Sequence, residues 1–302
     1  MSIFLMKLFA LIAMLIDLIA EVFGWEGWNL IPFNTSFLRY IGRISFPIFA
    51  FSLVVGWKNT HNKEKYFSRI LLFALISQIP FSMALYASNI STVTSADISF
   101  SFRTSVIFIP IAVFSVVSYW YFSLKRKLLP FLFIVFSTAL LPAFRLKIDY
   151  IWFFTTDSLN VLYTLALGLV LLFVIDKVSE RSLHVVEYIW LFILSGLLLL
   201  AYGTNADYGI GLMGVVLIVA LYLVQTNKFF QSGVVAVWGM IYYGLVLTNW
   251  KNAFATFIPA VFILLYNQKR GTNSVQSKWL FYIFYPLHLL IIGLFNMLIK
   301  WI

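Results

Sequence analysis

The 302-residue sequence contains no cysteine and only three histidines, which lie far apart in the chain. Without thiols there can be no disulfide or thiolate metal ligand, and with so few imidazoles we expect no metal site. Charge is also scarce, because Asp, Glu, Lys and Arg make up 11% of the residues, against about 25% in soluble domains. The motifs GxxxxGK[ST], HExxH and GxSxG are absent. Nucleotide-loop, zinc-protease and serine-hydrolase chemistries are therefore excluded.

Apolar residues fill the chain instead. They make up 62% of it, and the mean hydropathy is +0.96. A soluble core of this size cannot bury so much apolar surface, so the sequence predicts a protein embedded in a lipid bilayer. The net charge of +10 is explained by basic residues that flank membrane helices on the cytoplasmic side. We therefore expect no nucleic-acid partner.

Windows of apolar residues long enough to cross a membrane recur along the whole sequence, with no internal repeat and no soluble linker. They predict an all-α, polytopic integral-membrane helical bundle of about 10–11 transmembrane helices, forming a single domain over residues 1–302. The expected location is the cytoplasmic (inner) membrane. The eleven windows are 3–23, 41–57, 66–87, 104–123, 127–144, 152–175, 187–203, 208–224, 230–247, 252–267 and 278–300.

The distribution of lysine and arginine predicts the orientation. With alternating spans, the N-terminus and the loops after every second span carry fourteen of the 21 basic residues. Cytoplasmic loops are enriched in such residues. We therefore expect a cytoplasmic N-terminus.

Two carboxylates lie inside the first apolar run, in the stretch MLIDLIAEVF. A charged residue at the centre of a membrane helix costs about 2.5–3.5 kcal/mol and by default marks a functional site. Asp17 and Glu21 are four residues apart and share a helix face. Arg43, at the outer start of the second span, is a candidate partner for Asp17, either as a simple ion pair or as part of a site. Glu21 is close enough to the interface to be merely solvated.

Three further polar residues fall at or near membrane depth. Asn160 precedes an apolar run, Asp207 opens the eighth span, and His288 lies near the middle of the last span, just after Pro286. Proline frees a backbone carbonyl and kinks a helix, which can shape a cavity. The alternatives are that Asp207 is an N-cap and that His288 is an intramembrane hydrogen-bonding residue.

These residue types together suit proton transfer at an acyl group. A neutral histidine can take the proton from an attacking amine, a carboxylate can orient the imidazole, and Arg, Asn or Tyr can stabilise an oxyanion. The loop from Lys58 to Arg69 offers cations for an anionic cosubstrate, or serves only as a topological anchor. Its candidate binding residues are His61, Lys63, Lys65 and Arg69.

Specific strings of the sequence resemble the TraX family, which includes the enzyme that N-acetylates the pilin of conjugative pili. The strings are GRISFPIFAFSLVVGWKNTHNKEKYFSRILLFALISQIPF (42–81), KLFALIAMLID (7–17), SLNVLYTLALGL (158–169), ADYGIGLMGVVLI (206–218) and KWLFYIFYPLHLLII (278–292). The matching positions are Asp17, Arg43, Pro47, His61, Asn62, Tyr66, Arg69, Gln78, Pro80, Asn160, Asp207, Tyr208, Tyr285, Pro286 and His288.

The resemblance implies a membrane acetyltransferase with acetyl-CoA as cosubstrate and a pilin or secreted-peptide N-terminus as a possible acceptor. We expect His288 to be the general base, Asp17 its orienting group, and Arg43 an acceptor or oxyanion contact, in a cavity that Asn160 and Asp207 also line. One position departs from the family, whose first helix has a histidine after the aspartate where this chain has Leu18. The alternatives are a catalytically silent scaffold of a conjugation or secretion system, and a small-solute transporter.

Overall fold

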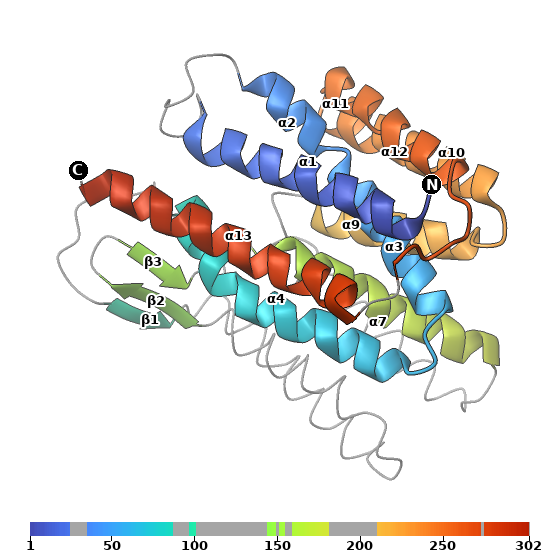
Figure 1. Ribbon diagram of the computed structural model, residues 1–302, viewed down its shortest axis with the longest axis horizontal. Helices are drawn as coiled ribbons and strands as arrows, with labels where there is room; N and C mark the ends of the chain where they lie inside the picture. The colour runs from blue at the N-terminus through green and yellow to red at the C-terminus, as the bar shows by residue number, and fades with distance from the viewer. Residues whose placement is uncertain are drawn as a thin grey trace, which may run out of the picture. The chain divides into compact units, whose positions relative to one another are not determined.

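The computed structural model of the protein describes residues 1–24, 35–86, 97–100, 144–148, 151–154, 159–180, 210–272 and 275–301. These residues are mostly helical (Figure 1). The chain forms two compact units. Unit 1 comprises Met1–Thr60 and Val216–Ile302, and unit 2 comprises His61–Val215. The predicted spans 104–123 and 187–203, and 127–144 except for Phe144, lie outside the described residues.

Five helical segments of the described chain are long and apolar enough to cross a membrane, which confirms the predicted class. They match the first, second, third, ninth and eleventh predicted spans. They are α1 (Ile3–Phe23), α2 (Ser36–Gly42) with α3 (Ser45–Lys58), α4 (Lys63–Tyr86), α10 (Lys228–Gly239) with the π-helix η4 (Met240–Val246), and α13 (Val275–Trp301). Because a helix rises about 1.5 Å per residue, the 21 residues of α1 can span the hydrocarbon core.

The other described helices are α7 (Val161–Glu180), α9 (Gly211–Leu223), α11 (Trp250–Ala255) and α12 (Phe257–Leu264). Three short strands, which the sequence analysis did not predict, form an antiparallel sheet in the order β1 (Asp97–Phe100), β2 (Phe144–Ile148), β3 (Ile151–Phe154). β3 occupies the start of the predicted span 152–175. The helix begins instead after Asn160, whose side-chain Oδ1 accepts a hydrogen bond from the Leu162 backbone N–H at 3.1 Å, as an N-cap does.

The helices of unit 1 run in the directions that the alternation of spans predicts. α1 and α13 lie side by side and parallel (Figure 1), with ring centroids 5.6 Å apart in both Phe4–Phe281 and Phe23–Phe295. α10 and α12 are antiparallel, because Lys228 at the start of α10 donates to the Leu264 carbonyl. One turn further on, Ser232 donates to the Ala260 carbonyl.

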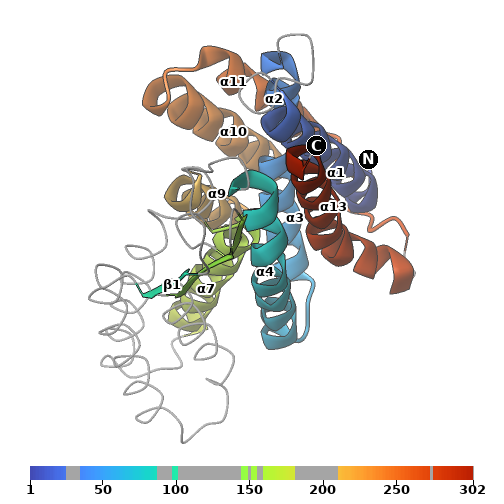
Figure 2. The ribbon, with the colours of Figure 1, turned by 90° about the vertical axis from the view of Figure 1, so that its left-hand side faces the viewer.

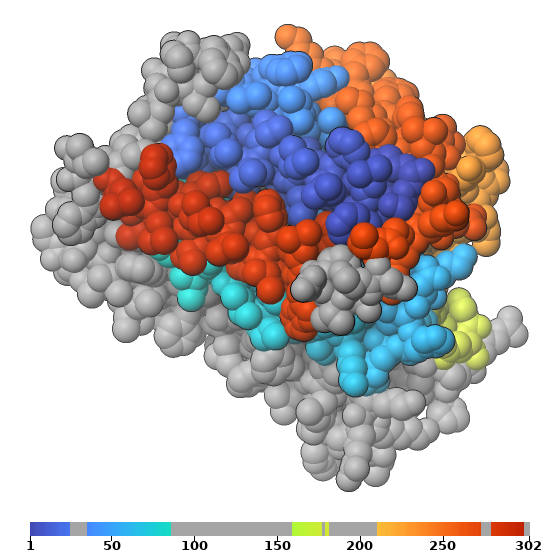
Figure 3. All heavy atoms as spheres, in the orientation of Figure 1, coloured from blue at the N-terminus to red at the C-terminus, as the bar shows by residue number. Residues whose placement is uncertain are grey.

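The start of α1 is joined to the turn that precedes α13. The N–H groups of Ile3 and Phe4 donate to the carbonyls of Lys269 and Arg270 at 3.1 and 3.2 Å. In Figure 3 the side chains of α1 lie against this turn. The N-terminal segment and the residues that follow the eighth and tenth predicted spans therefore lie at one end of unit 1, as predicted.

Unit 2 is organised around the antiparallel pair α4 and α7 (Figure 2). Lys63 at the start of α4 pairs with Asp176 near the end of α7. Asn160, just before α7, bonds to the Ala74 carbonyl about three turns along α4. The loops after the second and sixth predicted spans therefore lie on one side of unit 2, as the predicted topology requires.

Candidate functional site in unit 1

Asp17 and Arg43 form an ion pair between α1 and the turn that joins α2 to α3. The carboxylate Oδ2 lies 3.9 Å from the guanidinium Nη1, which confirms the predicted pairing. The second oxygen, Oδ1, is buried and has no hydrogen-bond partner. A buried carboxylate oxygen without a partner is energetically costly, so Asp17 retains the capacity to accept a hydrogen bond from a ligand.

Gly42 allows α2 to approach the carboxylate closely. A Cβ at position 42 would lie 2.2 Å from Asp17 Cγ and 2.6 Å from its Oδ1. The absence of a side chain is therefore required here, as it is wherever backbone approaches a functional group closely.

Tyr243 is a part of this region that the sequence analysis missed. Its ring centroid lies 5.9 Å from the guanidinium carbon of Arg43, within cation–π range. Tyr242 and Tyr243 are each only 2% exposed, and both rings pack against Trp238. The two neighbouring tyrosines lie in η4, where the Leu247 N–H bonds to the Tyr242 carbonyl at 3.0 Å. π-helical turns of this kind occur frequently at functional sites.

Glu21 also forms an ion pair, with Arg39 of α2. The prediction that Glu21 is merely solvated is therefore wrong. The cause is the return of the chain through α2, which packs against α1 and places Arg39 against the carboxylate. Two acids one turn apart on α1 thus meet two arginines four residues apart.

His288 lies in α13 and is 5% exposed. Its Nδ1 is 2.7 Å from the Phe284 carbonyl, one turn earlier. Since a carbonyl only accepts, Nδ1 donates the hydrogen, and the lone pair of the neutral imidazole is on Nε2. Nε2 is buried without a hydrogen-bond partner. The ring also stacks on Phe284, with centroids 4.8 Å apart.

No hydrogen bond or ion pair joins Asp17 to His288, although their helices are neighbours in unit 1. The group that orients the imidazole is the Phe284 carbonyl, where the sequence analysis expected the Asp17 carboxylate. This backbone contact has no sequence signature beyond its spacing of four residues. It leaves the lone pair of His288 available for a proton.

Asn160 belongs to unit 2 and is completely buried there. Its amide nitrogen donates to the Ala74 carbonyl at 2.7 Å and to Gln78 Oε1 at 2.9 Å. Because Asn160 also caps α7, its polar atoms are satisfied by the protein itself. Asp207, the other predicted cavity residue, lies outside the described residues.

The predicted cosubstrate loop is mostly helical, because Lys63, Lys65 and Arg69 lie in the first turns of α4 in unit 2. Lys63 is paired with Asp176, and the Arg69 Nε donates to the Lys65 carbonyl at 3.1 Å. His61, Lys65 and Arg69 are exposed. Asn62 caps α4 by accepting from the Lys65 N–H at 2.8 Å. The ion pair with Asp176 therefore offsets the charge of Lys63, one of the four predicted binding residues.

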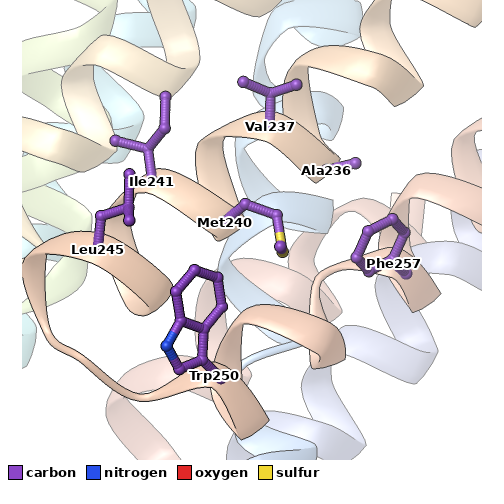
Figure 4. A pocket seen from close by; sticks show the side chains of 7 residues that line it. All are labelled: Ala236, Val237, Met240, Ile241, Leu245, Trp250 and Phe257. Atoms are coloured by element: carbon purple, nitrogen blue, oxygen red, sulfur yellow. The ribbon is translucent and has the colours of Figure 1, made fainter.

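A cavity of about 410 Å³ lies among α10, η4, α11 and α12 (Figure 4). Its lining carries no ionisable group and consists of Ala236, Val237, Met240, Ile241, Leu245, Trp250 and Phe257. Such a surface suits contact with lipid tails and offers no group for acid–base chemistry. The polar residues of unit 1 described above, and not this cavity, therefore form its candidate site.

Comparison with known proteins identifies the family. The family model described as TraX protein matches residues 2–153 and 116–296. A relative from Dichelobacter nodosus, named "Probable fimbrial assembly protein FimC, serogroup H1", is 33% identical over 112 residues. That alignment covers 37% of this chain and 43% of the relative, so the chain spans less than half the length of that protein. No solved structure matches the chain. Because the family model covers nearly the whole sequence, the chain belongs to the TraX family.

Proposed function

We propose that this protein is an acetyltransferase of the cytoplasmic (inner) membrane that moves an acetyl group from acetyl-CoA to a primary amine. Membership of the TraX family and the membrane-spanning helices support this assignment. The concentration of basic residues at one end of unit 1 supports an orientation with the N-terminus in the cytoplasm.

The observation that carries the proposal is the buried, unpartnered Nε2 of His288 in a membrane span. In the proposed step the amine nitrogen attacks the thioester carbonyl carbon, and His288 Nε2 takes the amine proton. The carbon–sulfur bond then breaks, and the imidazolium returns the proton to the leaving thiolate. Arg43 stabilises negative charge on the carbonyl oxygen, and Asp17 holds Arg43 in place.

The acceptor we propose is the N-terminus of a pilin or of a secreted peptide. The relative named for fimbrial assembly supports this choice. The unpartnered Oδ1 of Asp17 supports it chemically, because it can accept a hydrogen bond from an incoming amine.

Transfer of acetyl groups by purified full-length protein tests the proposal. His288→Ala should lower the rate by about 100-fold or more, which is the usual contribution of a general base. Ser232→Ala is the matched control, because it removes another buried polar side chain of unit 1 and should leave the rate near wild type. If His288→Ala retains the wild-type rate, His288 is not the base.

Leu18 favours a second function, a catalytically silent scaffold in pilus assembly or secretion. This leucine follows Asp17 on α1 and is half-buried, at the position where the TraX resemblance places a histidine. An inactive wild type that gains acetyl transfer on Leu18→His would establish the scaffold function. A wild type that already transfers acetyl groups, at a rate that Leu18→His leaves unchanged or lowers, would exclude it.

A further inference from the structure

We propose that the phosphate groups of the acyl donor bind at the amino-terminal end of unit 1, to Lys228, Lys269, Arg270 and Lys7. The inference rests on the proposed function. It places the phosphates of the donor away from the segment of residues 61–69 at the start of α4. This set of four residues is called the basic end below.

The basic end is assembled from three separate stretches of the chain. Lys228 meets the Leu264 carbonyl at 3.1 Å, and the turn that contains Lys269 and Arg270 is bonded to Ile3 and Phe4. Lys7 lies over the Phe281 ring, 5.2 Å from its centroid. Lys228, Lys269 and Arg270 are exposed, and no carboxylate pairs with them among the described residues.

Negative charge is missing from this end of the described part of unit 1. The sequence contains no Asp or Glu after Asp207. The described acids of unit 1, Asp17 and Glu21, lie ten or more residues beyond Lys7 on α1, at least about 15 Å away at 1.5 Å per residue. Burial raises the pKa of the nearby Tyr266 phenol, so this group adds no negative charge either.

The segment of residues 61–69, at the start of α4, is less suited to a multiply charged anion. Its cations are Lys63, Lys65 and Arg69, but Asp176 pairs with Lys63 and Glu64 is exposed beside it. The Asp176 carboxylate contacts Lys63, and Glu64 lowers the net charge of this segment by one more unit. The basic end has four cations and no described acid, and an arginine among them can bind phosphate with two hydrogen bonds.

The basic end also lies at a suitable place along the helices. His288 follows Phe281, the ring beneath Lys7, by seven residues of α13, a rise of about 10 Å. A donor held by its phosphates at this end can extend a linear arm along the neighbouring α1 and α13 toward His288 (Figure 3). The phosphates and the reacting thioester of one donor molecule would thus lie at different positions along the same pair of helices.

The test measures the binding of CoA and dephospho-CoA, which lacks the 3′-phosphate, to full-length protein in a detergent without phosphate. The double variant Lys269→Gln/Arg270→Gln should weaken CoA binding by at least about tenfold, since the loss of even one charge-assisted hydrogen bond has an effect of this size. The same double variant should lose less affinity for dephospho-CoA than for CoA. Lys251→Gln, an exposed lysine at the opposite end of unit 1, is the control and should bind CoA as wild type does.

Two results would overturn the inference. One is unchanged CoA affinity in the double variant while Lys65→Gln/Arg69→Gln abolishes binding. The other is a double variant that binds CoA as the wild type does and loses only its retention of anionic lipid in nanodiscs. If CoA binding depends on the basic end but no amine is acetylated, the proposed function is wrong and the subsite stands. If acetyl transfer proceeds with an unchanged KM for acetyl-CoA in the double variant, the subsite is wrong and the function stands.

Discussion

Asp17 in unit 1 and Asn160 in unit 2 are both polar residues in apolar surroundings, and they differ in how far the protein satisfies them. Asn160 makes hydrogen bonds to Ala74, Gln78 and Leu162. Asp17 has one oxygen 3.9 Å from Arg43 and another without a hydrogen bond. A satisfied polar side chain holds helices together, whereas a carboxylate left partly unsatisfied can bind a ligand. Polarity alone, as seen in the sequence, does not separate these roles.

Asp17→Asn tests this difference between the two residues most directly. Acetyl transfer should fall by about 100-fold, because a misplaced Arg43 lowers the rate on this scale. The free energy of unfolding in detergent should fall by only about 1–2 kcal/mol, since the amide still fits the space. If Asp17→Asn lowers the free energy of unfolding but leaves the rate per folded molecule at the wild-type value, Asp17 is a structural residue like Asn160.

Gly42→Ala tests the close approach of α2 to Asp17. The new Cβ would lie 2.2 Å from Asp17 Cγ, so we expect a loss of about 1–3 kcal/mol in stability from overpacking and a fall in rate as Asp17 is displaced. Gly233→Ala is the matched control, since a Cβ there meets nothing within 4 Å. It should be neutral or stabilise α10 by up to about 1 kcal/mol. Equal effects of both variants on unfolding would contradict the close approach.

Asn160→Ala should show the opposite signature, a loss of stability without a loss of reaction rate per folded molecule. Intramembrane hydrogen bonds contribute modestly, so the expected cost is about 1–2 kcal/mol. In a double-mutant cycle with Gln78→Ala the two effects should be non-additive, because Gln78 Oε1 accepts from Asn160. A rate per folded molecule that falls as steeply as in Asp17→Asn would place Asn160 in the reaction site.

The sequence predicted the features that depend on local pattern. Apolar length, helix spacing and alternating topology were enough to predict three features. These are the bounds of α1, the ion pair between Asp17 and Arg43, and the position of the N-terminal segment and Lys269 at the same end of unit 1. These features need no knowledge of which helices pack together.

The missed features depend on packing. The ion pair of Glu21 requires the position of α2, and the burial of Tyr243 requires a π-helical turn. The Phe284 carbonyl holds His288 through a backbone contact, which residue types do not reveal. The strands replace part of a predicted helix because Ile, Trp and Phe in short runs also favour β-structure.

Tyr243 gives the smallest expected effect and the finest test of the region around Arg43. Tyr243→Phe keeps the ring against Arg43 and should retain the wild-type rate within about twofold, since a cation–π contact needs only the ring face. Tyr243→Leu removes that contact, worth about 0.5–1 kcal/mol, and should lower kcat by about two- to fivefold, because Arg43 stabilises the charge that develops in the transition state. Tyr242→Leu is the control, because Tyr242 packs on Trp238 in the same turn. If Tyr243→Phe lowers the rate as much as Tyr243→Leu, the hydroxyl is the functional group and Tyr243 acts through a hydrogen bond.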